Sequence, residues 1–335
     1  MPVPDYNELF EKFHQLRVMV VGDVMVDAYL FGHVERISPE APVPVVQVDR
    51  RINRLGGAAN VALNIKSLGA EPVLCSVTGN DQKGREFMQL LKEEGISGGG
   101  IISSTRRITT TKFRVIGNKT QMLRVDEEMT DDLDQADQAA FLKTVLGSLE
   151  KEKINVIIFQ DYDKGVLTPV VIRKIIDRAI SMNIPVAVDP KRRNFMQYKG
   201  ADLFKPNLKE LREGLNRDIR PGNLNDLEEA ALFFHDEKSN RIVMSTLSDK
   251  GVFVSHRAPD GKIYQQIIPA HVRNIADVSG AGDTVISVAA LCLACAVSPF
   301  DIAALANMAG GLVCEEVGVV PVNRAKLLHE INHMH

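Results

Sequence analysis

The length and composition of the chain are those of an ordinary globular protein. Its 335 residues are 45% apolar and 25% charged, which suffices for a large core in one big α/β domain or in two ordinary ones. A net charge of -3 and a pI near 6.3 argue against nucleic acid or an acidic membrane surface as the main partner. Small molecules are therefore the expected ligands.

No secretory signal and no membrane-spanning segment are expected. The first residues contain no basic stretch followed by an apolar core. The longest nearly apolar run, Val285 to Val297, is shorter than the roughly 20 residues that a membrane-spanning helix needs. Four cysteines in apolar surroundings suit reduced thiols and predict a cytoplasmic protein. They are Cys75, Cys292, Cys295 and Cys314.

The first part of the chain is expected to combine helices and strands with an inserted β-sheet. Residues 28–54, rich in Val and Pro, predict a pair of strands, and residues 105–126 predict a hairpin around Gly117–Asn118. The two segments would join into one small sheet. Around them we expect helices over 5–16, 56–69 and 81–94, strands over 17–22 and 72–77, and a loop over 95–100.

From residue 131 the predicted elements alternate regularly. Strands that alternate with helices imply a mainly parallel sheet with helices on both faces, whose ligand site lies beyond the carboxyl ends of the strands. Asp23, Asp161, Asp189 and Asn207 each follow a predicted strand, so they should converge on one edge. The expected helices are 131–151, 168–183, 208–215, 224–236, 282–297 and 299–317, and the expected strands 155–159, 184–188, 201–205, 241–245, 251–255 and 264–268.

The segment from Asp277 to Thr284 carries small residues between two carboxylates. Backbone N–H groups of such small residues can approach a ligand closely, and a helix that begins here adds unpaired N–H donors that favour a phosphate. Asp283 would repel a phosphate, but it is well placed to accept a proton from an attacking hydroxyl. The alternative is a glycine-rich turn capped by aspartates.

Two further patterns suit the binding of a polyol. Asp23 and Asp27 lie on either side of a strand-to-loop transition, so both carboxylates can accept hydrogen bonds from vicinal hydroxyls, unless one of them caps the turn. Gly56-Gly57-x-x-Asn60 combines close backbone approach with an amide that both donates and accepts. Tight helix packing would explain the two glycines equally well.

Asn207 and Glu210 lie one turn apart at the start of a helix. Oxygen ligands on one face can hold Mg²⁺ through water beside nucleotide phosphates, and a capping box explains the same spacing. Residues 161–165 and 189–194 bring lysines and arginines to the same edge. These cations suit a phosphorylated substrate, although Arg192 and Arg193 are expected to be solvated.

Four patterns are discounted. Gly79 to Gly84 has the spacing of a P-loop, but Arg-Glu follows where Lys-Ser/Thr is required. The string His329 to His333 resembles a zinc-protease motif in a tail that is expected to fray. Cys292-x-x-Cys295 has no second pair, and Gly280-x-Gly282 lacks the third glycine of a nicotinamide-binding loop.

Together these elements resemble the ribokinase (PfkB) family of sugar kinases over essentially the whole chain. Gly56 to Asn60 resembles the first signature of the family, Asp277 to Asp283 its second, and Asn207-x-x-Glu210 its metal-associated motif. The resemblance implies a ribokinase-like three-layer sandwich in a single domain over residues 1–335, with a small β-sheet lid built from the insertions at about 28–54 and 105–126. It also implies a homodimer that forms through the lid.

Within the family, four segments resemble the bacterial heptose-7-phosphate kinases. These are residues 20–27, 36–45, 112–115 with 121–126, and 161–165. The implied reaction is ATP-dependent phosphorylation of the C1 hydroxyl of D-glycero-D-manno-heptose 7-phosphate, on the way to ADP-heptose for lipopolysaccharide. Since the chain ends after the kinase module, a stand-alone kinase without the nucleotidyltransferase half of bifunctional relatives is expected.

The resemblance also implies a role for individual residues. Asp283 is the base, and Gly280, Ala281 and Gly282 form the anion hole for the γ-phosphoryl group. The sugar hydroxyls would be bound by Asp23, Asp27, Gly57 and Asn60. The substrate phosphate would be bound by Lys112, Arg114, Lys164 and Lys191. Asn207 and Glu210 would lie near Mg²⁺ and the ATP phosphates. The nucleotide would be surrounded by Ser245, Gly251, Asn307 and Gly310, and Asp277 would help to bind a monovalent cation such as K⁺.

One departure from the family concerns the nucleotide loop, where Ser248 replaces a usual glycine, so the nucleotide preference is less certain than the fold. Three competing functions are kept. They are another sugar or nucleoside kinase of the family, a non-catalytic sugar-binding regulator on the same scaffold, and a dehydrogenase. An intact Asp283 argues against the regulator, and a dehydrogenase predicts nicotinamide binding without a need for Mg²⁺.

Overall fold

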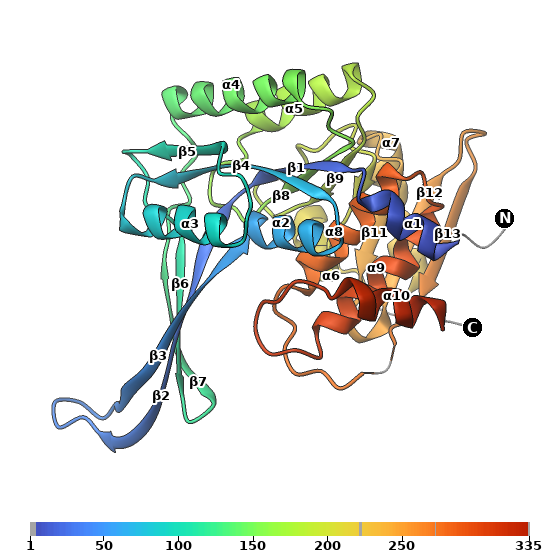
Figure 1. Cartoon of the computed structure of the whole chain (residues 1–335). Coiled ribbons are helices and arrows are strands. Elements are labelled where there is room, and N and C mark those ends of the chain that lie inside the picture. The colour runs from blue at the N-terminus through green and yellow to red at the C-terminus, as the bar shows by residue number, and fades with distance from the viewer. Residues whose placement is uncertain (1–4, 221–222, 272, 334–335) are drawn as a thin grey trace.

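The computed structural model describes residues 5–220, 223–271 and 273–333. They form a large sheet between two layers of helices, and a second, smaller sheet projects from one end of the molecule (Figure 1). This arrangement confirms the predicted three-layer α/β fold with a β-sheet lid. None of the helices in the described ranges is both long enough and apolar enough to cross a membrane.

The central sheet has nine strands in the order β13-β12-β11-β10-β9-β8-β1-β4-β5. The strands from β11 to β5 are parallel, and β12 and β13 add an antiparallel meander at one edge. The strands are β1 (Arg17–Gly22), β4 (Glu71–Gly79), β5 (Gly100–Ser104), β8 (Val156–Gln160), β9 (Val186–Asp189), β10 (Leu203–Phe204), β11 (Ile242–Thr246), β12 (Val252–Arg257) and β13 (Ile263–Ile268).

Helices cover both faces of this sheet, and each face has its own core. In β1, Val18 and Val20 belong to one core, while Met19 and Val21 belong to the other, as the two-residue period of a strand dictates. Helices α4, α5, α6 and α7 pack on the second face and the remaining helices on the first. Figure 1 shows α4 and α5 on the opposite side of the sheet from α2 and α3. The helices are α1 (Tyr6–Phe13), α2 (Ala58–Ser67), α3 (Gln82–Glu93), α4 (Gln135–Lys151), α5 (Pro169–Ser181), α6 (Leu208–Leu215), α7 (Leu224–Glu237), α8 (Ala281–Ala294), α9 (Pro299–Val313) and α10 (Arg324–Asn332).

The smaller sheet is the lid, with strands in the order β3-β2-β6-β7. It consists of β2 (Val24–Ile37), β3 (Pro44–Gly57), β6 (Thr111–Gly117) and β7 (Thr120–Glu127). The two predicted β segments thus join through the parallel pair β2 and β6. The β6–β7 turn has Asn118 and Lys119 at its centre, both with positive φ, the backbone that favours a tight hairpin. Large apolar side chains of the lid are exposed at Ile37, Val43, Val48, Met122, Leu123 and Val125.

Two segments differ from the prediction. Residues 95–100 were expected to be a loop, and no strand was expected to follow them, yet β5 begins at Gly100 and pairs with β4. A Cβ on Gly100 would overlap the carbonyl oxygen of Leu74, so the glycine that suggested a loop is there for close strand pairing. The C-terminal tail was expected to fray, but α10 has an N-cap at Asn323 and buries Leu327 and Ile331.

Candidate active site

Asp283 lies in the first turn of α8, beyond the carboxyl ends of the parallel strands. Gly280 is the N-cap, with φ +83, and its helix end receives no side-chain cap. The first N–H groups of a helix have no intrahelical partner. The Ala281 N–H donates to the carbonyl of Val278 at 3.3 Å, while those of Gly282 and Asp283 have no partner among the described residues and remain available to an anion. The carboxylate of Asp189 lies close to this turn, since a Cβ on Gly282 would be 3.8 Å from Asp189 Oδ2. The turn therefore offers an anion-binding helix end with a carboxylate beside it.

The carboxylate of Asp283 is buried and accepts three hydrogen bonds. Asn60 Nδ2 donates to Oδ2 at 2.7 Å, and Gln160 Nε2 and the Tyr162 hydroxyl donate to Oδ1 at 3.1 and 2.7 Å. Burial raises the pKa of Asp283 to about 6, with a smaller contribution from Asp189, while Asn60 and Tyr162 oppose the rise. A carboxylate with this pKa is ionised at neutral pH and still basic enough to take a proton.

A buried ion pair lies next to this base. Lys205 Nζ is 3.0 Å from Asp189 Oδ2, and both side chains are almost fully buried. Gln160 Nε2 also donates to Asp189, at 3.3 Å, so one amide connects both carboxylates. Gln160, Tyr162 and Lys205 were not predicted to have a role in the site. Their only signal is position, because each comes at or just after the end of a strand.

Asp23 forms hydrogen bonds to the backbone of the loop at residues 162–166. Its buried carboxylate accepts hydrogen bonds from the backbone N–H groups of Tyr162, Lys164 and Val166 at 2.9 to 3.1 Å. Burial raises the pKa of Asp23 although these three donors oppose the rise. The geometry favours the alternative in which Asp23 caps backbone groups, and its role in sugar binding stays a prediction.

Gly57 and Asn60 lie where β3 leads into α2. Gly57 has φ +62, and a Cβ there would overlap the carbonyl oxygen of Asp23, so close packing alone explains this glycine. Asn60 is fully buried and its amide donates to Asp283, while its Oδ1 has no partner among the described residues. An acceptor of this kind suits a ligand hydroxyl or a bound water.

The predicted phosphate-binding cations differ in how far they are already paired. Arg114 forms an ion pair with the buried Asp27, and Lys164 forms one with Glu128 at 2.9 Å. Lys112 is partly buried, and no carboxylate lies within 4.0 Å of it in the described part of the chain. Burial lowers the pKa of Lys112, although Asp27 counteracts this. Lys112 is therefore the cation of this group that is free to meet an anion.

Asn207 and Glu210 form the capping box of α6. Asn207 Oδ1 accepts from the Glu210 N–H at 2.9 Å, and Glu210 Oε2 accepts from the Asn207 N–H at 2.8 Å. The other Glu210 oxygen pairs with Lys191. Burial lowers the pKa of Lys191, but Asp189 and Glu210 outweigh this effect and hold the pKa well above its usual range. The capping box, which was the alternative to a Mg²⁺ site at these two residues, is therefore present. No group of three or more His, Cys, Asp or Glu side chains suited to a metal occurs among the described residues, so these two residues fit Mg²⁺ only through water.

The residues expected around the nucleotide have mixed environments. Ser245 is fully buried and its hydroxyl has no partner within the described ranges, which suits a ligand contact. Gly251 has φ +92, and Asn307 donates to the carbonyl of Pro269 at 2.9 Å. A Cβ on Gly310 would lie 2.6 Å from Val285 Cγ2, so helix packing explains that glycine. The roles of these residues in nucleotide binding stay predictions.

Asp277, at the start of the segment from Asp277 to Thr284, connects this segment to the loop at Gly318. Its carboxylate accepts from the N–H groups of Ser279 and Gly318 at 2.9 and 3.0 Å. Burial would raise the pKa of Asp277, but these hydrogen bonds outweigh it and lower the pKa. The capped-turn alternative therefore describes Asp277, while Asp283 belongs to the anion site.

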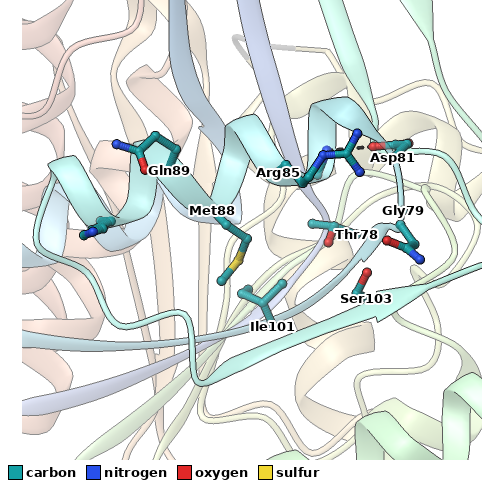
Figure 2. Close-up of a pocket in the computed structure, with 11 residues that line it drawn as sticks. Thr78, Gly79, Asp81, Arg85, Met88, Gln89, Ile101 and Ser103 are labelled. Atoms are coloured by element: carbon teal, nitrogen blue, oxygen red, sulfur yellow. Dashed lines mark hydrogen bonds between the residues drawn. The ribbon is translucent and has the colours of Figure 1, made fainter.

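A cavity of about 390 Å³ lies away from Asp283, between α3 and strands β4 and β5 (Figure 2). None of its lining residues was a predicted site residue. Asp81 caps α3 by accepting from the Gly84 N–H at 2.6 Å, so a carboxylate occupies the place where a P-loop would bind phosphate. The chemistry of the carboxylates and lysines, rather than the size of the cavity, locates the candidate active site.

Residues 15–325 match the profile of the pfkB family carbohydrate kinases. The chain belongs to this family. Its fold agrees with two solved structures. Phosphofructokinase-2 from Escherichia coli in complex with potassium gives a TM-score of 0.77 at 18% identity, over 95% of this chain and 99% of that one. Ribokinase from Arabidopsis thaliana, complexed with ribose and ATP, gives 0.68 at 17% identity, over 93% and 98%.

Curated relatives of this pfkB-family kinase are more similar in sequence. The D-beta-D-heptose 7-phosphate kinase of Bordetella bronchiseptica is 39% identical over 96% of this chain and 97% of that protein. The bifunctional protein HldE of Geotalea uraniireducens is 36% identical over 99% of this chain but only 66% of its own length. The kinase therefore spans about two thirds of the bifunctional relatives that it matches.

Proposed function

We propose that this kinase transfers the γ-phosphoryl group of ATP to the C1 hydroxyl of D-glycero-D-manno-heptose 7-phosphate, giving the 1,7-bisphosphate for ADP-heptose and lipopolysaccharide precursor synthesis. The observation that carries the proposal is the 39% identity to a heptose 7-phosphate kinase over almost the full length of both chains. The buried base at a helix N-terminus supports it, together with Lys112, a lysine without a carboxylate partner among the described residues. Small-molecule substrates of this kind also agree with a cytoplasmic location.

In the proposed reaction Asp283 accepts the proton of the C1 hydroxyl, the sugar oxygen forms a bond to the γ-phosphorus, and the bond between that phosphorus and the oxygen of ADP breaks. The N–H groups around Gly280, Ala281 and Gly282 would stabilise the charge on the transferred group. Such a transfer depends mainly on positioning and charge stabilisation. A base with a pKa of about 6 suits this task at neutral pH.

The sugar phosphate would lie between the lid and the central sheet. Asp27 and Asn60, with Asp23 and Gly57 behind them, would face the sugar hydroxyls. Lys112 and Arg114 on lid strand β6 would reach the 7-phosphate, and Lys191 would approach from the other side. Lys112 has no carboxylate partner within the described ranges, which supports this placement, because a charge-assisted hydrogen bond from Lys112 to phosphate breaks no existing ion pair.

ATP and Mg²⁺ would bind on the side of α6 and β11. Asn207 and Glu210 would hold Mg²⁺ through water, and the ion would supply positive charge beside the nucleotide phosphates. The unpaired hydroxyl of Ser245 supports a contact with the nucleotide, beside Gly251, Asn307 and Gly310. Asp277 is kept as the proposed ligand of K⁺.

The lid is the proposed dimer interface. Its exposed apolar side chains, Leu123 at 57% exposure and Ile37 at 61% among them, are typical of a surface that another protein covers. A second copy of the chain, packed lid against lid, would bury them.

Purified protein, ATP and Mg²⁺ with a panel of sugars and sugar phosphates test the proposal. We expect ADP formation that depends on heptose 7-phosphate. If another sugar supports turnover and this one does not, the chain is a different kinase of the family. Sugar binding without any ADP formation would instead identify a regulator.

A further inference from the structure

Tyr162 is the partly exposed donor to the base. Its hydroxyl donates to Asp283 Oδ1 at 2.7 Å, and the side chain is only partly buried. Asn60 and Gln160, the other two donors, are 0% and 1% exposed. Of the three donor residues, Tyr162 is therefore the one with part of its surface exposed.

The backbone around Tyr162 is fixed by several hydrogen bonds, whereas its side chain forms one. Asp23 accepts the N–H groups of residues 162, 164 and 166. The neighbouring Asp161 accepts from Asp163 N, Asn194 Nδ2 and the Tyr198 hydroxyl at 2.8, 3.2 and 2.7 Å. In the described part of the chain, the phenol has a single hydrogen bond, the one to Asp283. Rotation of one side chain can therefore break it without any backbone change.

The carboxylate of Asp283 has no lone-pair position left for a further donor on Oδ1, and one on Oδ2 beside Asn60. A carboxylate offers about four lone-pair positions, and on Oδ1 both are taken, by Gln160 and Tyr162. We propose that Tyr162 is a gate on the catalytic base, whose hydroxyl holds the place of the acceptor hydroxyl on Oδ1 until the sugar binds and displaces it. This inference rests on the proposed kinase function.

Two lysines connect the gate to the substrate phosphate. Lys112 Nζ lies 5.6 Å and Lys191 Nζ 5.5 Å from the centroid of the Tyr162 ring, within the range of cation–π attraction. Both are candidate ligands of the 7-phosphate, and Lys112 comes from the lid. A phosphate that draws these lysines away from the ring removes part of what holds it, so a phosphorylated sugar would open the gate more readily than a neutral one.

The gate would restrain the idle hydrolysis of ATP. In that side reaction Asp283 takes a proton from water, the water oxygen bonds to the γ-phosphorus, and the bond to ADP breaks, giving ADP and inorganic phosphate. A tyrosine hydroxyl on Oδ1 denies water that position. Burial and the adjacent Asp283 hold the pKa of Tyr162 well above its usual value, so the phenol remains a donor throughout the working pH range.

Tyr162→Phe removes the hydroxyl and keeps the ring. We expect sugar-independent ADP formation to rise about tenfold or more, the change that corresponds to loss of one hydrogen bond to a charged group. The matched control is Tyr198→Phe, which also removes a hydroxyl from a buried carboxylate, Asp161, and should leave idle hydrolysis unchanged. An idle rate that is unchanged or lower in Tyr162→Phe, together with a lower kcat, would mean that Tyr162 only orients the base.

The pH profile supplies a readout that a purely structural role would not move. Asp283 faces Tyr162, Asp189, Lys205 and Lys191. Since the Tyr162 hydroxyl lowers the pKa of Asp283, its removal should shift the acid limb of kcat/KM to higher pH, whereas Tyr198→Phe should not. An unshifted limb contradicts the gate.

A spectroscopic test needs no turnover. The chain has five tyrosines and no tryptophan, so heptose 7-phosphate added without ATP should give a tyrosine ultraviolet difference spectrum that Tyr162→Phe lacks. Saturating binding by calorimetry with no spectral change in the wild type would overturn the gate. If the wild type consumes no ATP with any sugar, the proposed function fails, which is a separate outcome.

Discussion

Lys112 is expected to supply the main charge for the 7-phosphate, and Lys112→Met tests this. A hydrogen bond to a charged group contributes about 1.5 to 3 kcal/mol, or roughly 10- to 150-fold. Because Lys112 has no carboxylate partner among the described residues, no competing ion pair offsets the loss. We expect kcat/KM for heptose 7-phosphate to fall by that factor, mainly through KM.

The assay compares heptose 7-phosphate with the same heptose without its phosphate. Lys112→Met should weaken activity toward the phosphorylated sugar and change activity toward the neutral sugar little. Lys164→Met is the control, because Lys164 already pairs with Glu128 and should cost less than about fivefold, as partly exposed ion pairs do. An equal loss on both sugars, or a larger loss in Lys164→Met, would refute the reasoning.

The remaining predictions concern the base, the buried ion pair and the lid. The pKa of about 6 at Asp283 predicts that kcat/KM falls about tenfold per pH unit well below pH 6, because the protonated carboxyl cannot accept the sugar proton; a flat profile down to pH 5 would contradict this. Lys205→Met should lower the free energy of unfolding by about 3 to 5 kcal/mol in urea titrations, since the buried Asp189 loses its ion-pair partner and keeps only the hydrogen bond from Gln160; a loss below about 1 kcal/mol would show that the pair is not needed. Leu123→Glu should shift the protein to monomers in sedimentation, and an unchanged mass would exclude the lid as the interface.

The position of the site could be predicted from the sequence because the topology rule is strict. Parallel strands end at one edge, so Asp23, Asp161, Asp189 and Asn207 lie there once the strands are assigned correctly. The helix that begins at Ala281 follows from small residues before a long apolar run. Both inferences depend on local patterns alone.

The partners of the site residues could not be predicted in this way. Asp23 accepts backbone groups from a loop about 140 residues later, and nothing in its own neighbourhood indicates this. Gln160 looks like the polar end of an apolar strand until the fold brings it within 3.1 Å of Asp283. Strand β5 was missed for a related reason, since its glycine-rich start indicates a loop unless the pairing with β4 is known.

Phosphate transfer from ATP to heptose 7-phosphate, followed in wild-type enzyme and in Asp283→Asn, tests the central claim most directly. The amide keeps the shape of the carboxylate but cannot accept the proton. We expect sugar-dependent ADP formation and a heptose 1,7-bisphosphate product with the wild type, and a loss of at least 100-fold in kcat with the variant, within the range of a general base. Turnover in Asp283→Asn at close to the wild-type rate would contradict the account.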